Sequence, residues 1–341
     1  MTVLSGGVFG SAPDDLTDLR NLVDDIGARS FDAKIGHRSL PDAFDNAAWR
    51  NLEDAGLTRL MCTPDSGAGP AEVAVVLRSL ARHAVSVPLA ETDVLAGWLA
   101  ERAGLEVPDA GPLTVATALD AVPYGGDAAA VVLALREGDR LRVAVCNPAE
   151  LEITRGHNAG GEPRDTVTID RPDDAVILVD AAQELTRRGA WARCVQIIGA
   201  LDAAVEFSVA HTREREQFGR PLSAFQAVQH ALAGMAGEVE RARAATDLAV
   251  AAAAGHGFDS PQTDYAVTVA KVTLGQVVPS VVTAAHQLHG AIGVTIEHRL
   301  WLATMRARSW IGEFGDTAGY ACRLGRLALS AGDPWDVIVG Q

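Results

Sequence analysis

The stretch Thr212-Arg-Glu-Arg-Glu-Gln-Phe-Gly-Arg-Pro-Leu222 decides how this chain folds, because it separates two long segments with apolar residues at helical spacing. The first segment runs from about residue 180 to 211, and the second runs from about 223 to 254. Two long helices joined by so short a connector must turn back on each other. The sequence therefore predicts a tight corner between antiparallel helices.

The residues of this corner suit an anionic ligand. Phe218-Gly219 predicts the end of the first helix, since glycine accepts left-handed backbone, and Pro221 predicts the first turn of the next helix. The corner then displays Arg213, Arg215 and Gln217 beside an aromatic ring. A guanidinium in such a place suits a phosphate or pyrophosphate. Taken alone, the same run would equally describe a solvated helix end.

A second motif, Gln287-Leu-His-Gly290-Ala-Ile-Gly293, closes another apolar helix further along the chain. Its two glycines, three residues apart, permit a close approach of the backbone to a ligand. The two motifs on successive helices, in this order, are much more specific than either motif alone.

Composition excludes several classes of partner. The chain has 44 acidic and 29 basic residues and a net charge of −15, so nucleic acid and anionic membrane surfaces are not expected partners. Local arginines must therefore hold any anionic ligand. The four cysteines are widely scattered, which argues against a disulfide or zinc framework and for a reducing compartment.

The first residues lack the basic and apolar regions of a secretory signal, and no run of the sequence has the length expected of a membrane span. We therefore expect a cytoplasmic protein.

The order of patterns predicts an α+β fold with segregated strands. We expect an N-terminal helical domain at 1–111, a small β domain at 112–180 and a C-terminal four-helix bundle at 181–341. Residues 130–135 and 141–146 predict a β-hairpin, followed by short strands at 151–154, 166–169 and 175–179. The four bundle helices are predicted to end near His211, Ala254, His289 and Leu329.

With both motifs placed, the chain resembles the acyl-CoA dehydrogenase family over nearly its full length. The resemblance also includes Trp49-Arg-Asn-Leu-Glu-Asp-Ala-Gly-Leu57 and Arg82-His-Ala-Val-Ser-Val-Pro-Leu-Ala-Glu91. It implies a helical domain, a β domain and a bundle that together hold FAD and an acyl-CoA thioester. It further implies α,β-desaturation of the thioester, with the hydride passing to flavin N5, and a flavin shared between two subunits.

The resemblance also implies which residues contact the cofactor. In the family, the two motifs reach across the subunit interface to the pyrophosphate and adenosine of the neighbouring subunit's FAD. The residues implied here are Arg215, Gln217, Phe218, Leu222, Phe225, Gln226, Gln287, Gly290, Ala291, Gly293 and Thr317.

The resemblance leaves the catalytic base open. The family base is usually a glutamate in a Tyr-Glu-Gly-Thr turn, and that position falls on Gly315 here. Glu313 is the best remaining candidate, although a capping or solvated glutamate would have the same sequence signal. The other family position falls near Arg188, with Glu184 one turn earlier. Asp316 is predicted to cap the last helix.

The short β domain and the missing glutamate resemble the short subunits of heteromeric actinobacterial dehydrogenases that degrade steroid side chains. Such a subunit completes the flavin site of a partner, and an electron-transfer flavoprotein is the implied acceptor. Two alternatives stay open at this point. One is a flavin-free subunit that only stabilises a catalytic partner, and the other is an acyl-CoA oxidase.

Two histidines have a spacing that is compatible with a metal. His286 and His289 are three residues apart on one predicted helix, but the sequence offers no evident third ligand. We therefore expect structural roles for both residues and no metal site.

Overall fold

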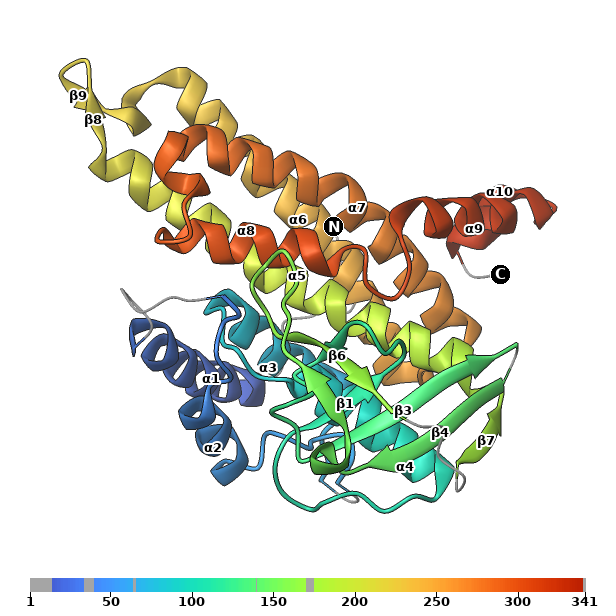
Figure 1. Ribbon diagram of the computed structural model, residues 1–341. Coiled ribbons are helices and arrows are strands. Elements are labelled where there is room, and N and C mark those ends of the chain that lie inside the picture. The colour runs from blue at the N-terminus through green and yellow to red at the C-terminus, as the bar shows by residue number, and fades with distance from the viewer. Residues whose placement is uncertain (1–13, 34–39, 64–65, 139, 170–174, 340–341) are drawn as a thin grey trace.

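The computed structural model describes residues 14–33, 40–63, 66–138, 140–169 and 175–339. Helices come first, strands follow, and long helices complete the chain (Figure 1). The predicted α+β class with segregated strands is confirmed.

The N-terminal block is helical because its apolar residues recur on one face and its helix ends are capped. In α2 the Asp45 carboxylate accepts a hydrogen bond from the Ala48 amide at 2.9 Å, and Trp49 and Leu52 are buried beneath that helix. The block contains α1 (Asp14–Ala33), α2 (Asn46–Asp54), α3 (Pro70–Arg82), the π-helix η1 (Ala90–Gly97) and α4 (Trp98–Ala103).

The β region consists of two small sheets. One has the strand order β1-β3-β4-β7 and the other β2-β6-β5. The predicted hairpin is confirmed as β3 and β4, in antiparallel register from Val131 opposite Cys146 to Glu137 opposite Arg140. The sequence did not signal the two strands that precede this hairpin. The strands are β1 (Leu113–Ala116), β2 (Val122–Pro123), β3 (Ala130–Glu137), β4 (Arg140–Cys146), β5 (Glu152–Thr154), β6 (Arg164–Thr168) and β7 (Val176–Val179).

The C-terminal bundle differs from the prediction in its fourth helix. The stretch expected to end near Leu329 is two helices, α8 and α9, because Phe314 and Gly315 adopt positive φ angles of 55° and 107° between them. Asp316 then caps α9, as predicted, by accepting from the Gly319 amide at 2.7 Å. The bundle helices are α5 (Ala181–Glu214), α6 (Gln226–His256), α7 (Pro261–His289), α8 (Arg299–Trp310), α9 (Thr317–Ser330) and α10 (Pro334–Val339).

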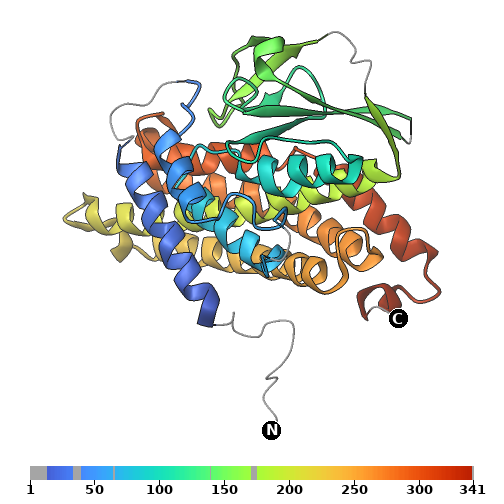
Figure 2. The ribbon, with the colours of Figure 1, turned by 90° about the horizontal axis from the view of Figure 1, so that it is seen from below.

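Two short elements complete the bundle. The strands β8 (Glu216–Gln217) and β9 (Arg220–Pro221) form a small hairpin between α5 and α6, and the 3-10 helix η4 (Gly290–Val294) follows α7. The hairpin protrudes from the end of the bundle that lies away from the large sheet (Figures 1 and 2). The N-terminal helix α3, the π-helix η1 and strand β4 pack against α5, and α3 also contacts α6.

Two segments are long and apolar enough to cross a membrane by length and composition, so the expectation that no run would reach that length is wrong. They are Ala181–Glu214 and Pro261–Val294. Both segments lie in the bundle. In each of them, 56% of the apolar 18-residue stretch that meets this criterion is buried inside the protein. Helices in the core of a water-soluble bundle have the same composition, so the finding is weak support for membrane insertion.

The crossing of α5 and α3 depends on a glycine. A Cβ atom added at Gly199 would lie 2.1 Å from the carbonyl oxygen of Arg78, whereas one added at Gly237 on the exposed side of α6 would meet nothing within 4 Å.

We predict that Gly199→Ala destabilises the protein by about 1–3 kcal/mol, because two packed helices must move apart. The matched variant Gly237→Ala should be neutral or stabilising by up to about 1 kcal/mol, since alanine favours an exposed helix. Urea unfolding of both variants checks this, and equal effects would contradict the proposed close contact.

Candidate functional site

The corner between α5 and α6 is a β-hairpin rather than a direct helix-to-helix turn. Phe218 and Gly219 occupy its two central positions with φ angles of 53° and 76°, the left-handed pair that a two-residue hairpin requires. The Leu222 amide donates to the Arg215 carbonyl at 2.9 Å and closes the hairpin. Phe218 is therefore held at the tip, where 90% of its surface is exposed.

This geometry corrects two details of the sequence prediction. The helix α5 ends at Glu214, before the glycine, and Pro221 lies in β9 rather than in the first turn of α6. The physical reason is that Arg215 has extended backbone, with φ −78° and ψ 118°, so its carbonyl can pair across the hairpin.

The end of α7 supplies the opposite wall. Gly290 has a φ of 67°, and a Cβ atom there would meet nothing within 4 Å, so its backbone faces open space. Gly293 has a different role, because a Cβ atom there would lie 2.7 Å from the Cβ of His289. The first glycine thus opens the helix end to a ligand, and the second allows close packing behind it.

The two motifs converge on one cavity of about 610 Å³. None of the described residues that line it is acidic, although the chain as a whole carries 44 acidic residues. A cavity with arginine and amide side chains and no carboxylate suits an anion. The lining residues are His211, Arg215, Gln217, Leu222, Ala227, Val228, Ala231, Ala284, Gln287, Leu288, His289 and Gly290.

The structure brings together only part of the implied cofactor set. Arg215, Gln217, Leu222, Gln287 and Gly290 all line the cavity. The other six implied residues are not among the lining residues. The rings of Phe218 and Phe225 contact each other at the corner, Gln226 begins α6, Ala291 and Gly293 lie in η4, and Thr317 begins α9 beside Gly275.

The two histidines of this cavity, His211 and His289, are among the lining residues that the sequence reasoning missed. His286, which has a metal-compatible spacing to His289, lies 2.9 Å from the Thr304 hydroxyl. His289 is buried, and this burial lowers its pKa to about 4, against the effect of its hydrogen bond to the Ala285 carbonyl. Its ring stacks on that of His211 with centroids 4.4 Å apart.

A second cavity, of about 480 Å³, lies between the sheets and α5. Its walls are mostly apolar, and Arg193, Arg164, Glu91 and Glu313 form a charged group at one side. The remaining lining residues are Leu95, Val115, Thr117, Ala118, Ala121, Pro123, Arg136, Leu185, Thr186, Phe314 and Gly315.

Glu313 is fixed between two arginines. Its Oε1 atom accepts from Arg164 at 2.8 Å, its Oε2 atom accepts from Arg193 at 2.6 Å, and Arg193 also donates to Glu91 at 2.5 Å. Burial alone would raise the pKa of Glu313, but the two guanidinium groups and their hydrogen bonds lower it to about 2. Such a carboxylate is a weak proton acceptor. Lys271 fixes the same turn by donating to the Glu313 carbonyl at 2.9 Å.

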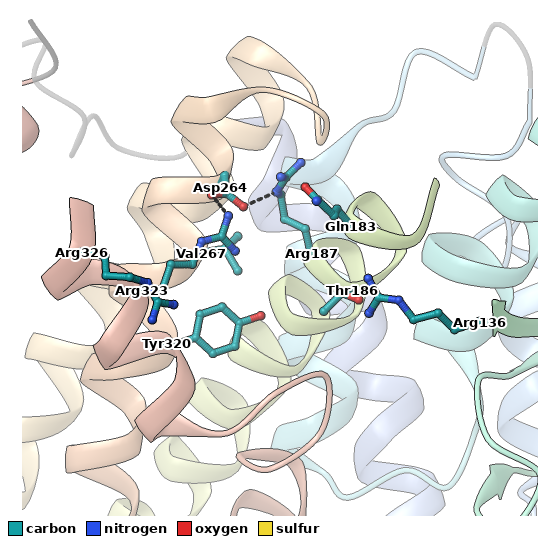
Figure 3. Close-up of a pocket in the computed structure, with 9 residues that line it drawn as sticks. All are labelled: Arg136, Gln183, Thr186, Arg187, Asp264, Val267, Tyr320, Arg323 and Arg326. Carbon is teal, nitrogen blue, oxygen red and sulfur yellow. Dashed lines mark hydrogen bonds and ion pairs between the residues drawn. The ribbon is translucent and has the colours of Figure 1, made fainter. Parts of the chain in front are cut away.

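A third cavity, of about 330 Å³, lies next to the second and shares Arg136 and Thr186 with it. Four arginines from three elements line this cavity, which also contains Asp264 (Figure 3). Asp264 pairs with Arg187 at 2.8 Å and with Arg323, so two arginines are held in place by one carboxylate. The lining residues are Arg136, Gln183, Thr186, Arg187, Asp264, Val267, Tyr320, Arg323 and Arg326.

Comparison with known proteins decides the family. The family model "Acyl-CoA dehydrogenase, C-terminal domain" matches residues 179–313. The chain is 30% identical over 287 residues to acyl-CoA dehydrogenase IpdE2 of Mycobacterium tuberculosis, covering 77% of this chain and 81% of that protein. The chain belongs to the acyl-CoA dehydrogenase family.

Solved structures agree with this fold. The ChsE4-ChsE5 complex from Mycobacterium tuberculosis matches with a TM-score of 0.80 at 22% identity, over 94% of this chain and 99% of that one. The Tcur3481-Tcur3483 steroid ACAD, in its G363A variant, matches with a TM-score of 0.79 at 26% identity, over 93% and 98% of the two chains.

This member of the acyl-CoA dehydrogenase family has glycine near both positions where the resemblance implies a base. Gly315 occupies the turn position. Gly189 lies near the other position, beside Arg188, and a Cβ atom there would be 2.3 Å from the Phe314 ring. Glu184 is buried and pairs with Arg188 at 2.9 Å. Each nearby carboxylate on the described chain, Glu313 and Asp316 included, is therefore already engaged in an ion pair or a cap.

We predict that Glu313→Gln destabilises the protein by about 3 kcal/mol at neutral pH, because it removes the shared partner of two buried arginines. The pKa of Glu313 is lower in the folded chain, so its contribution is present above pH ~4.5 and is lost as pH falls toward 2. Denaturant unfolding of wild type and variant across this range measures the difference. The exposed Glu240→Gln serves as a control and should change stability by less than about 0.5 kcal/mol.

Proposed function

We propose that this chain is a subunit of an FAD-dependent acyl-CoA dehydrogenase and that its bundle completes a flavin site shared with another subunit. The observation that carries the proposal is the convergence of Arg215 and Gln217 with Gln287 and Gly290 on one cavity without acidic lining. Either motif by itself would describe an ordinary helix end.

The residues present fit the diphosphate part of FAD. Arg215 supplies a permanent positive charge, and Gln217 and Gln287 supply amide donors. The open backbone at Gly290 leaves room for the diphosphate to approach closely. Leu222 offers an apolar wall for the adenosine. When bound, FAD accepts the hydride from the β-carbon of the acyl group.

The other two cavities fit an acyl-CoA thioester as the substrate. The arginine-lined cavity suits the phosphates of CoA, and the adjoining cavity has apolar walls for the acyl group. Arg136 and Thr186 belong to both cavities, so one extended ligand can occupy them together. Similarity to the Tcur3481-Tcur3483 steroid ACAD supports a steroid side chain as the acyl class.

The engaged carboxylates support a heteromeric assembly. Since Glu313 binds two arginines and Gly315 has no side chain, we propose that the partner subunit supplies the base that removes the α-proton. Similarity to a chain of the ChsE4-ChsE5 complex supports a partner from the same family. An electron-transfer flavoprotein is the acceptor that we propose for the reduced flavin.

Arg215→Ala tests the flavin site. We expect the variant to bind ADP, the diphosphate half of the cofactor, about 10–100-fold more weakly than the wild-type chain, because a charge-assisted contact is lost. Titration calorimetry measures the affinity. Arg213→Ala is the matched control, since Arg213 belongs to the same helix end but does not line the cavity.

The same two variants can be co-expressed with a dehydrogenase-like chain encoded by a neighbouring gene. The Arg215→Ala assembly should then contain less flavin than the Arg213→Ala assembly, as measured by visible absorption. Full flavin occupancy in the Arg215→Ala assembly would favour a flavin-free stabilising role for this chain. A lone wild-type chain that purifies with full flavin and desaturates acyl-CoA would contradict the shared site.

Two arginines of the third cavity test the proposed CoA position. Arg136 and Arg326 line the cavity, and neither contacts Asp264, which holds Arg187 and Arg323. We predict that Arg136→Ala and Arg326→Ala each weaken CoA binding by about tenfold, with a smaller effect at high salt. The exposed Arg308→Ala on α8 is the control. An equal loss in all three variants would contradict this position for the CoA phosphates.

A further inference from the structure

Three histidines from different parts of the chain meet beside the cavity of the two motifs. His211 lies in the last turns of α5, His289 ends α7, and His298 precedes α8. One ring nitrogen from each lies within 4.8 Å of the other two. They are 9 residues apart at the closest and 87 at the farthest in sequence, so no local spacing brings them together.

His289 has the hydrogen-bond arrangement of a metal ligand. Its Nδ1 atom lies 2.8 Å from the Ala285 carbonyl and donates to it, which leaves a lone pair on Nε2. The residue is 94% buried, and on the described chain its Nε2 makes no hydrogen bond of good geometry, although the backbone of Phe207 also interacts with the ring. A ligating histidine typically donates its other ring nitrogen to a backbone carbonyl in this way. A buried unpaired nitrogen requires an explanation, and a cation supplies one.

The dimensions of the cluster are close to those of a coordination site. The centre of a triangle with sides of 4.8 Å lies about 2.8 Å from each corner, and a zinc–nitrogen bond is about 2.0–2.1 Å. Each ligating nitrogen would move by less than about 1 Å toward the centre. The rings of His289 and His298 already stand at 70°, with centroids 5.0 Å apart, so their planes do not have to become parallel to share an ion.

The chemistry of the ligands indicates which kind of cation fits. The ligand set contains imidazoles and no carboxylate, which selects zinc, cobalt, nickel or copper over magnesium or calcium.

We propose that His211, His289 and His298 bind one divalent transition-metal ion at the wall of the motif cavity. His211 and His289 line that cavity, so the fourth coordination position faces it and can take water or an anionic oxygen. The ion would connect the ends of α5 and α7 with the start of α8 and add positive charge beside Arg215.

The three histidines make unequal contributions in this proposal. His211 is only partly buried and stacks on His289 at 21°, so it must rotate to direct its lone pair at the ion. His298 must also give up a hydrogen bond, since its Nδ1 accepts from the Leu300 amide at 3.1 Å. His289 needs neither change, and its loss should weaken metal binding most.

Cobalt(II) and zinc(II) are the probes for this site. We expect the full chain, without an affinity tag, to bind one Co²⁺ with visible absorption bands of a four-coordinate ion, and one Zn²⁺ by calorimetry that displaces the cobalt. His289→Gln should weaken Zn²⁺ binding by at least about 100-fold, and His211→Gln and His298→Gln by about tenfold or more. Zn²⁺ should also raise the melting temperature of the wild-type chain.

The exposed His230→Gln on α6 is the matched control and should bind zinc as the wild type does. Circular dichroism without metal checks that each variant is folded. If His289→Gln does not fold, the partly buried His211→Gln decides the question. The proposal is overturned if the wild type binds less than one equivalent, or if His230→Gln loses as much affinity as the cluster variants. Metal binding needs no nucleotide, and ADP binding by the metal-free chain separately tests the flavin site.

Discussion

The carboxylate of Glu313, held between Arg164 and Arg193, is the interaction on which the interior of this protein depends. Arg164 belongs to β6, Arg193 to α5 and Glu313 to the turn between α8 and α9, and Glu91 of η1 extends the chain of charges. Charges removed from water must be paired, so these elements cannot separate without large cost. The network thus fixes the walls of the proposed acyl cavity. It also engages the carboxylate of Glu313 in ion pairs, and Glu313 was the best candidate for a catalytic base in the sequence.

Local sequence signals were sufficient for the layout of the fold. Apolar periodicity predicted the bundle helices, and the strand pattern predicted the β3–β4 hairpin. The residues at the start of α9 predicted the cap that Asp316 forms. The errors lie where backbone geometry competes with periodicity. The turn between α8 and α9 contains Phe314 and Gly315 with positive φ angles, and the left-handed pair Phe218-Gly219 makes a hairpin where a helix end was expected.

The candidate sites also contain features that could be predicted from the sequence and features that could not. Resemblance alone indicated that Arg215 and Gln287 belong to one ligand site, and the structure places both on one cavity. Sequence spacing could not predict the histidine cluster, because its three members come from different parts of the fold. The two histidines with a metal-compatible spacing, His286 and His289, do not meet in it, since His286 contacts Thr304 instead. The ion pairs of Glu313 were equally hidden, since Arg164 and Arg193 are more than 100 residues away in sequence.

The π-helix η1 makes this region unusually sensitive to insertions and deletions. Its hydrogen bonds span one residue more than those of an α-helix, and all eight of its residues are buried. Loss of one residue would restore α-helical register and rotate everything on its N-terminal side by about 100°. Glu91 would then turn away from Arg193 without any change in the residues themselves. A one-residue deletion in this segment would therefore break the ion-pair network while leaving each of its residues in place.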